Sequence, residues 1–295
     1  MVEYNTIVLG AGISGISCAI YLKRAGIKTL LLENGMPGGQ LNKASIIENY
    51  PGYVSIGGSE LSSMLLEQVQ SNNIDLIYDE VGTIDYDNKI ITVGDTKYHY
   101  KYLVFATGRR ERTLGLDDED KWLGRGISLC ATCDGMLYKD QEVIVVGGGS
   151  SAVSEAIYLS NIVSKVYLIY RGTDLRAEEV LKERLNSISN IEIIYEGVIT
   201  SYLVFDDKLA GVCLKSGRKI EASCVFLAIG HIPNSELFTG NKTDGYIEID
   251  EYGETSISDV YACGDVVNKE VYQLITASSE GVLAASSIIK RNQMR

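Results

Sequence analysis

The sequence predicts an α/β protein made of two similar three-layer domains, the second inserted into the first. Three observations predict this fold class. The chain has 295 residues, which is enough for two domains. It contains one strand–turn–helix pattern twice. Each copy also closes on a similar turn of small residues, Ala106-Thr-Gly108 in the first and Ala228-Ile-Gly230 in the second.

The repeated pattern is a short buried strand, a glycine-rich turn and a helix. Residues 6–9 lead into Gly10-Ala-Gly12-Ile-Ser-Gly15, and residues 143–146 lead into Gly147-Gly-Gly149-Ser-Ser-Ala152. In such a turn the first glycine permits the sharp bend, the second lets a pyrophosphate approach the backbone, and the small third residue allows close helix–strand packing. The helix that follows presents free N–H groups and a partial positive charge to the phosphates. Both copies therefore have the pattern of a Rossmann-like dinucleotide-binding domain.

The residue at the tip of the next strand distinguishes the two copies. In the first copy it is Glu33, 23 residues after the first glycine, and a carboxylate there accepts a hydrogen bond from a ribose hydroxyl. In the second copy the same offset reaches Tyr170, with Arg171 and Arg176 after it. Two arginines suit a ribose 2′-phosphate through charge-assisted hydrogen bonds, unless they are ordinary surface residues. The sequence thus assigns FAD to the first copy and NADPH to the second.

The two expected domains are interleaved rather than consecutive. After the second closing turn the chain runs on to Tyr261-Ala-Cys-Gly-Asp265, a strand that ends in Gly-Asp, and then into a last helix from about Ile275. The simplest topology puts residues 1–112 and 242–295 in a discontinuous FAD domain, with residues 113–241 inserted as the NAD(P)H domain. Two connecting segments would permit the domains to rotate relative to each other.

A pair of cysteines, Cys130 and Cys133, precedes the second turn. In a protein of the cytoplasm such a close pair is more often redox-active than structural. Disulfide exchange needs one accessible thiolate and one resolving thiol, and the adjacent Asp134 is placed to handle the proton of the leaving thiolate. With no second close pair and only two histidines, a metal site is not expected. The cysteines expected in the core are Cys18, Cys213, Cys224 and Cys263.

Charge and hydropathy exclude several classes of function. Lys and Arg total 27 against 39 Asp and Glu, and the net charge of −12 disfavours nucleic acid as a partner. No apolar run approaches the roughly 18 residues of a membrane helix. The first residues show no basic segment of a signal peptide, so we expect a cytoplasmic protein without a membrane partner.

These features closely resemble the low-molecular-weight thioredoxin reductases over nearly the whole chain. The resemblance implies a homodimer that reduces the disulfide of thioredoxin, or of a similar small protein, with electrons from NADPH and FAD. It also implies that the domains alternate between two arrangements. The shared stretches, besides the second turn, are Gly38-Gly39-Gln40-Leu41, Glu48-Asn49-Tyr50-Pro51-Gly52, Cys130-Ala-Thr-Cys133-Asp134-Gly135, Ala228-Ile-Gly-His-Ile-Pro-Asn234 and Gly264-Asp265.

The resemblance further implies roles for individual residues. Cys133 would face the flavin, Cys130 would attack the disulfide of the partner, and Asp134 would donate and accept the proton. The expected FAD contacts are Gly10, Gly12, Gly15, Glu33, Gly39, Gln40, Asn49, Asp265 and Gln273, and the expected NADPH contacts are Gly147, Gly149, Ala152, Arg171 and Arg176.

The sequence departs from the family pattern in three places. The motif His-Arg-Arg-x-x-x-Arg reads Tyr170-Arg-Gly172-x-x-x-Arg176, which removes one arginine and about 1–3 kcal/mol of phosphate binding. The motif Arg-Gln-Ala near the carboxyl end reads Tyr272-Gln-Leu274, with an aromatic ring in place of an arginine. The first turn differs from the usual Gly-Ser/Gly-Gly-Pro-Ala-Gly but keeps all three glycines.

The leading hypothesis is therefore an NADPH-dependent thioredoxin-disulfide reductase. One alternative is a relative that reduces its flavin with ferredoxin or another donor; Gly172 favours it, and the intact second turn opposes it. Another is a flavin oxidase that generates disulfides. The last is a redox sensor without turnover, which replacement of Cys130 or Cys133 would separate from the enzymes.

Overall fold

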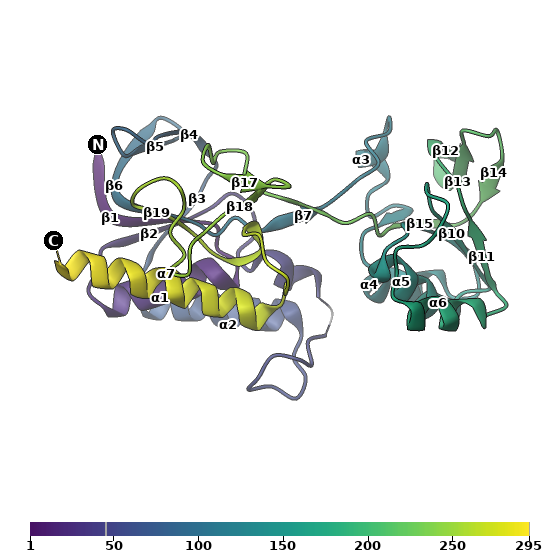
Figure 1. Ribbon diagram of the computed structural model, residues 1–295, viewed down its shortest axis with the longest axis horizontal. Helices are drawn as coiled ribbons and strands as arrows, with labels where there is room; N and C mark the ends of the chain where they lie inside the picture. Colours follow the sequence, from purple (N-terminus) through teal and green to yellow (C-terminus); the bar gives the residue numbers. More distant parts are fainter. Residues whose placement is uncertain (45, 295) are drawn as a thin grey trace. The chain divides into compact units, whose positions relative to one another are not determined.

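The structure is a computed structural model that describes residues 1–44 and 46–294. The chain divides into two compact units, Met1–Arg110 with Ile232–Arg295 and Glu111–His231. The α/β class predicted from the sequence is confirmed, with the second unit inserted into the first (Figure 1).

The chain returns to the first unit at Ile232, whereas the sequence suggested a return at residue 242. Aromatic packing explains the difference, because Phe238 meets Phe105 edge to face with ring centroids 5.4 Å apart. The hydroxyl of Tyr86 also donates to the carbonyl oxygen of Leu237 at 2.8 Å. The segment before residue 242 therefore packs into the core of the first unit.

The first unit contains a seven-stranded sheet in the order β3-β2-β1-β6-β5-β4, with β19 beside β6. Strands β3, β2, β1, β6 and β19 are parallel, and β5 and β4 continue the sheet in antiparallel fashion. Helices α1, α2 and α7 lie together on one face (Figure 1). The elements are β1 (Val2–Leu9), α1 (Ile13–Arg24), β2 (Thr29–Glu33), the 3₁₀ helix η1 (Gly39–Lys43), α2 (Gly58–Ser71), β3 (Asp75–Tyr78), β4 (Val81–Asp85), β5 (Ile90–Val93), β6 (Thr96–Phe105), β17 (Lys242–Thr243), β18 (Tyr246–Ile247), β19 (Val260–Ala262), the 3₁₀ helix η3 (Gly264–Val266) and α7 (Leu274–Met294).

The second unit contains a five-stranded parallel sheet in the order β11-β10-β9-β15-β8. Helices α4, α5 and α6 lie on one face, and a three-stranded antiparallel sheet, β12-β13-β14, covers the other (Figure 1). The elements of this unit and of the chain crossings are β7 (Arg109–Glu111), α3 (Glu119–Trp122), β8 (Ile127–Ser128), α4 (Ala131–Asp134), the 3₁₀ helix η2 (Gly135–Tyr138), β9 (Glu142–Val146), α5 (Ser150–Ser160), β10 (Lys165–Ile169), α6 (Glu179–Asn186), β11 (Ile191–Ile194), β12 (Ile199–Phe205), β13 (Lys208–Leu214), β14 (Lys219–Glu221), β15 (Cys224–Leu227) and β16 (His231–Pro233).

The two parallel sheets have matching arrangements around their central strands. β1 lies between β2 and β6, and β9 lies between β10 and β15. Their apolar runs are buried on both faces, as parallel strands covered by other layers require. Each glycine-rich turn follows the carboxyl end of such a central strand, between its two neighbouring strands. Ligands of doubly wound sheets bind at this point.

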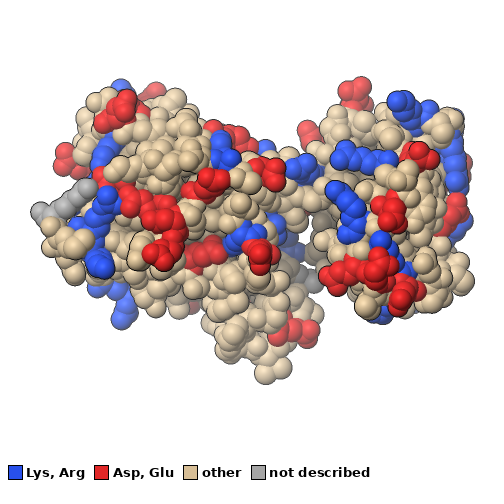
Figure 2. Space-filling view, viewed as in Figure 1, with Lys and Arg blue, Asp and Glu red and all other residues tan. Residues whose placement is uncertain are grey.

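Acidic and basic side chains are interspersed on the face shown in Figure 2, and no single charge type covers it. Within residues 1–44 and 46–294, no helix is both long and apolar enough to span a membrane.

Candidate functional site

The first glycine-rich turn leaves no room for side chains on its inner side. Gly10 has a φ of +102°, and a Cβ atom there would run into the carbonyl group of Ala106. A Cβ atom on Gly15 would run into the carbonyl oxygen of Gly10. Gly12 differs, because nothing lies within 4 Å of the place its Cβ would occupy, and it is the N-cap of α1. The turn is therefore closed toward the sheet and open where a phosphate would approach.

Glu33, at the end of β2, is fixed against this turn. Its Oε2 accepts a hydrogen bond from the backbone N–H of Ala11 at 2.7 Å, and its Oε1 accepts one from that of Gly35 at 2.8 Å. Hydrogen bonds to a carboxylate are stronger than neutral ones, so this carboxylate is held in one orientation beside the turn. The structure thus places Glu33 where the sequence expected a ribose-binding group.

The other expected FAD residues fall into two small networks. Gln40 donates from Nε2 to the carbonyl oxygen of Arg109 at 2.8 Å, and Asn49 donates from Nδ2 to Oε1 of Gln273 at 3.2 Å. Gly39 comes close to the first turn, since its Cβ would lie 3.6 Å from the Cα of Gly12. η1 therefore lies against the glycine turn, as a cofactor contact from Gly39 requires.

Asp265, expected at the end of the last strand, lies in η3 among positive charges. Its Oδ2 is 3.3 Å from Nε of Arg109, and its Oδ1 is 3.4 Å from Nζ of Lys269. Tyr272 belongs to the same cluster, because the guanidinium carbon of Arg109 lies 4.0 Å from the centroid of its ring. The sequence identified Asp265 but not its partners Arg109 and Lys269, for which no motif signals a role.

The second glycine-rich turn repeats the geometry of the first. Gly147 has a φ of +147°, and its Cβ would meet the carbonyl of Ala228. Gly149 is the N-cap of α5, and nothing lies within 4 Å of its Cβ position. Ala152 is fully buried beneath the turn, with its Cβ 2.7 Å from the place a Cβ of Gly147 would occupy. Ala152 thus shapes the turn from below, while Gly149 is open to a ligand.

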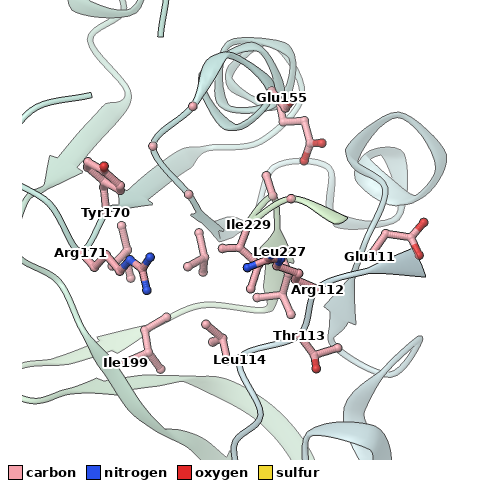
Figure 3. Close-up of a pocket in the computed structure, with 18 of the residues that line it drawn as sticks. Glu111, Arg112, Thr113, Leu114, Glu155, Tyr170, Arg171, Ile199, Leu227 and Ile229 are labelled. Atoms are coloured by element: carbon pink, nitrogen blue, oxygen red, sulfur yellow. The ribbon is translucent and has the colours of Figure 1, made fainter. Parts of the chain in front are cut away.

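A pocket of about 680 Å³ lies over this turn, wholly within the second unit. It brings together four residues expected from the sequence: Gly147, Gly149, Arg171 and Arg176. Ala152 does not line it. Figure 3 shows Tyr170 and Arg171 at one end of the pocket and Glu111 and Thr113 at the other.

Glu155 of α5 lines the same pocket and was not anticipated from the sequence (Figure 3). Burial raises the pKa of its carboxyl group to about 7. No hydrogen-bond donor in the described part of the chain reaches its buried Oε2. A glutamate on a helix gives no sequence signal of this kind, because only the fold determines which way the side chain points.

Cys130 and Cys133 are joined by a disulfide at the start of α4, with their Cα atoms 5.3 Å apart. The sulfur of Cys130 accepts a hydrogen bond from the backbone N–H of Cys133 at 3.2 Å, and Oγ1 of Thr132 lies 3.4 Å from it. Two polar groups thus contact the sulfur of Cys130.

Asp134 is oriented by a residue that sequence reasoning missed. The hydroxyl of Ser128 donates to Oδ2 of Asp134 at 2.7 Å and accepts from the backbone N–H of Cys130 at 3.1 Å. Ser128 is buried at the end of β8. It therefore connects the carboxylate to the backbone of the cysteine pair.

The remaining cysteines lie apart from this chemistry. Burial raises the pKa of the Cys224 and Cys263 thiols to about 12 and that of Cys18 well above its usual value. These three are buried, as expected, and Cys213 is half-buried. Residues 1–44 and 46–294 contain no cluster of three metal-ligating side chains.

Known proteins resemble this chain over nearly its whole length. Residues 4–281 match the pyridine nucleotide-disulphide oxidoreductase family. The thioredoxin reductase of Rickettsia conorii is 37% identical over 297 residues, covering 95% of this chain and 96% of that protein. The thioredoxin reductase of Bacillus subtilis is 33% identical, covering 97% of this chain and 93% of that protein.

Solved structures give the same result. The crystal structure of Lactococcus lactis thioredoxin reductase, in its FR conformation, has a TM-score of 0.82 and 34% identity, covering 99% of this chain and 100% of that one. A ferredoxin-flavin thioredoxin reductase from Clostridium acetobutylicum has a TM-score of 0.56 and 30% identity, covering 100% of both chains. The resemblance indicated by the sequence is confirmed by these similarities.

Proposed function

This chain belongs to the pyridine nucleotide-disulphide oxidoreductase family, and from that premise we propose that it is a thioredoxin-disulfide reductase. The observation that carries the proposal is the Cys130–Cys133 disulfide in a chain that also contains two open glycine turns. A disulfide alone would suit a structural role, and the turns alone would suit many dehydrogenases. Their combination suits electron transfer from a dinucleotide to a dithiol.

Members of this family work with a flavin and a pyridine nucleotide. We assign FAD to the first unit, because the Glu33 carboxylate lies beside its glycine turn, where it would accept a hydrogen bond from a ribose hydroxyl, and Gly12 is open beside the N-terminus of α1. We assign NADPH to the second unit, because Arg171 and Arg176 line the pocket over its glycine turn. When bound, the two cofactors supply the electron pair that reduces the disulfide.

The dithiol then acts through disulfide exchange. The Cys130 thiolate attacks one sulfur of the thioredoxin disulfide, and the other thioredoxin sulfur leaves as a thiolate. Cys133 next attacks the sulfur of Cys130 in the mixed disulfide, which releases the second thioredoxin sulfur and re-forms the Cys130–Cys133 bond. Hydrogen bonds from Thr132 and from the backbone of Cys133 support Cys130 as the attacking thiol.

Asp134 transfers the proton in this scheme. The two thioredoxin thiolates gain two protons: one is the proton that the Cys133 thiol loses before it attacks, and the other comes from solvent. The Ser128 hydroxyl keeps the Asp134 carboxylate beside the cysteine pair. A positioned carboxylate of this kind contributes roughly 10²–10⁴-fold as a general acid and base.

A ferredoxin-type donor is the second candidate, for a specific reason. A ferredoxin-flavin thioredoxin reductase is among the solved relatives at 30% identity, and Gly172 removes one arginine of the phosphate motif. Both candidates use the same dithiol and the same protein substrate. They differ in whether the pocket of the second unit binds a nucleotide.

An anaerobic titration of the yellow holoprotein tests the proposal and separates the two donors. NADPH, NADH and reduced ferredoxin are added separately while flavin absorbance is followed, and thioredoxin disulfide is then supplied. We expect bleaching by low NADPH, a much weaker response to NADH, and reduction of thioredoxin. Bleaching by ferredoxin alone would select the second candidate.

The cysteine variants complete this test. Cys130→Ser and Cys133→Ser should each retain FAD and lose thioredoxin reduction, while Cys213→Ser serves as a matched control with normal turnover. Full turnover in both dithiol variants would refute the mechanism. Oxygen consumption coupled to dithiol oxidation would favour a disulfide-generating oxidase, and altered partner binding without any turnover would favour a sensor.

We further propose that the enzyme is a homodimer of the cytoplasm. The similarity to thioredoxin reductases over at least 95% of the chain supports both statements. Light scattering coupled to size exclusion should give twice the 32.3 kDa mass of the chain. Cell fractionation should recover the protein with cytoplasmic markers.

A further inference from the structure

We propose that Tyr170 and Gly172 form a coupled pair that determines how tightly the second unit binds the 2′-phosphate of a nucleotide. The inference rests on the proposed function, because it requires a nucleotide in the pocket over the second turn. On this view residue 172 is a glycine because the Tyr170 ring occupies the space of a side chain there, and not only because an arginine was lost.

The ring of Tyr170 lies against two glycines. A Cβ atom on Gly148 would approach Cδ2, Cε2 and Cγ of this ring far inside contact distance. A Cβ atom on Gly172 would lie 2.6 Å from Cε1 and 2.9 Å from Oη of the same ring. Neither glycine has a φ in the left-handed region, so the backbone does not demand glycine at either position. The space taken by the ring is the physical reason for both.

The backbone around the ring is fixed on several sides. The N–H of Tyr170 donates to the carbonyl of Ile194 at 2.9 Å, and the N–H of Glu196 donates to the carbonyl of Gly172 at 3.0 Å. The N–H of Arg176 donates to the carbonyl of Gly148 at 2.7 Å. These bonds tie the segment after β10 both to the end of β11 and to the glycine turn. Because these bonds hold the backbone in place, a side chain added at position 172 must displace the Tyr170 ring itself.

The charges around the ring identify the ligand chemistry. Arg171 and Arg176 are exposed and line the pocket, and the guanidinium carbon of Arg176 lies 6.0 Å from the ring centroid of Tyr170. Two guanidinium groups remain available for a phosphate dianion. A third, from position 172, would have to share space with the tip of the Tyr170 ring. The pair thus limits the phosphate site to two arginines.

A double-mutant cycle tests the pair through binding rather than turnover. The oxidised holoprotein is titrated calorimetrically with NADP⁺ and NAD⁺ in four forms: wild type, Gly172→Arg, Tyr170→His, and both together. Histidine has no counterpart of Cζ and Oη, two of the three Tyr170 atoms that a Cβ at position 172 would meet, so its shorter ring relieves most of that overlap. We expect the double variant to bind NADP⁺ about 10-fold more tightly, each single variant to stay within about threefold of wild type, and NAD⁺ affinity to be unchanged.

Two control variants sharpen the cycle. Thr173→Arg adds the same charge at an exposed neighbouring position and should leave the NADP⁺ affinity within about threefold of wild type. Gly172→Ala keeps the test decisive if the arginine variant does not fold. It should lower the melting temperature with Tyr170 in place and should not do so in the Tyr170→His background.

The outcomes separate this inference from the proposed function. A full gain from Gly172→Arg alone, or from Thr173→Arg, would overturn the coupled pair while leaving NADPH as the donor. Binding of neither nucleotide by any of the four forms, with thioredoxin still reduced by ferredoxin, would overturn the nucleotide assignment and this inference with it.

Discussion

The two glycine turns share one backbone plan and differ in what stands beside it. In both, the first glycine has a positive φ and the second caps a helix with open space in front of it. Beside the first turn a carboxylate, Glu33, accepts two backbone hydrogen bonds. Beside the second turn an aromatic ring, Tyr170, fills the corresponding place. Strand–helix packing thus determines the turn, and the residue at the next strand tip is what distinguishes the two turns.

The helices after the two turns differ in the same way. Cys18, eight residues after Gly10, is completely buried in the apolar core of the first unit. Glu155, eight residues after Gly147, lines the pocket of the second unit. Equivalent positions on two similar helices therefore have different surroundings: one lies in the apolar core and the other faces a pocket.

The largest difference in stability between variants of the two turns is expected at the third position of each turn. Gly15→Ala should lower the free energy of unfolding by about 3 kcal/mol, because the new methyl group overlaps the carbonyl oxygen of Gly10. Ala152→Gly, the reverse change in the second turn, should lower it by only about 1 kcal/mol. Urea denaturation of both variants measures the difference. Equal losses would mean that the two turns are packed alike.

The next effect concerns the strand tip of the first unit. Glu33→Ala should weaken FAD retention by roughly 10–100-fold, because the two backbone donors beside the turn lose a charged acceptor. Flavin released on gel filtration measures this loss, with the exposed Glu3→Ala as the matched control. If Glu33→Ala retained FAD as well as wild type, Glu33 would not contribute to FAD binding.

A smaller effect should appear at Glu155 and should depend on pH. The folded chain holds this proton up to a pKa of about 7, whereas the unfolded chain releases it near the ordinary value of 4.5. The unfolding free energy of wild type should therefore decrease between pH 4.5 and 7 and stay level above that window.

Glu155→Gln should remove that decrease, with a relative gain of about 3 kcal/mol at pH 8 over pH 4. Chemical denaturation at the two pH values, without nucleotide, measures it. Glu183→Gln, on the exposed side of α6, is the control. Identical pH profiles for wild type and Glu155→Gln would show that the carboxyl group ionises as readily as one in water.

The sequence predicted the parts of the site that local chemistry determines. Gly10, Gly147 and Glu33 stand out because a turn and a ribose hydroxyl each require a particular residue at a particular spacing. The hydrogen bond from Ser128 to Asp134 could not be predicted in this way, because it exists only once β8 and α4 bring the two residues together. The direction of the Tyr170 ring is likewise a product of the fold.

The sequence likewise predicted only those parts of the fold that have a local pattern. The parallel strands around the two turns, such as β10 at Lys165–Ile169, have apolar runs that identify them. The antiparallel sheet β12-β13-β14 and the strands β4 and β5 were not predicted, since they are short, only partly buried, and paired according to the surface that they cover. The return at residue 232 also depends on tertiary packing, through Phe238.

The smallest expected effect is the coupling energy between a tyrosine and an arginine, which can be compared between one such pair in each unit. Arg109 lies 4.0 Å from the ring centroid of Tyr272, and Arg176 lies 6.0 Å from that of Tyr170. A guanidinium over a ring contributes about 0.5–1 kcal/mol at an exposed site and loses most of this near the 6 Å limit. Double-mutant cycles with Tyr→Leu and Arg→Met should therefore give a coupling energy of about 0.5–1 kcal/mol in the first unit and less than half of that in the second. Each cycle cancels the separate ion pair of Arg109 with Asp265. Equal coupling energies in the two units would mean that Arg176 and Tyr170 lie closer together in solution than 6.0 Å. Arg176 would then contact the ring instead of being free for a phosphate.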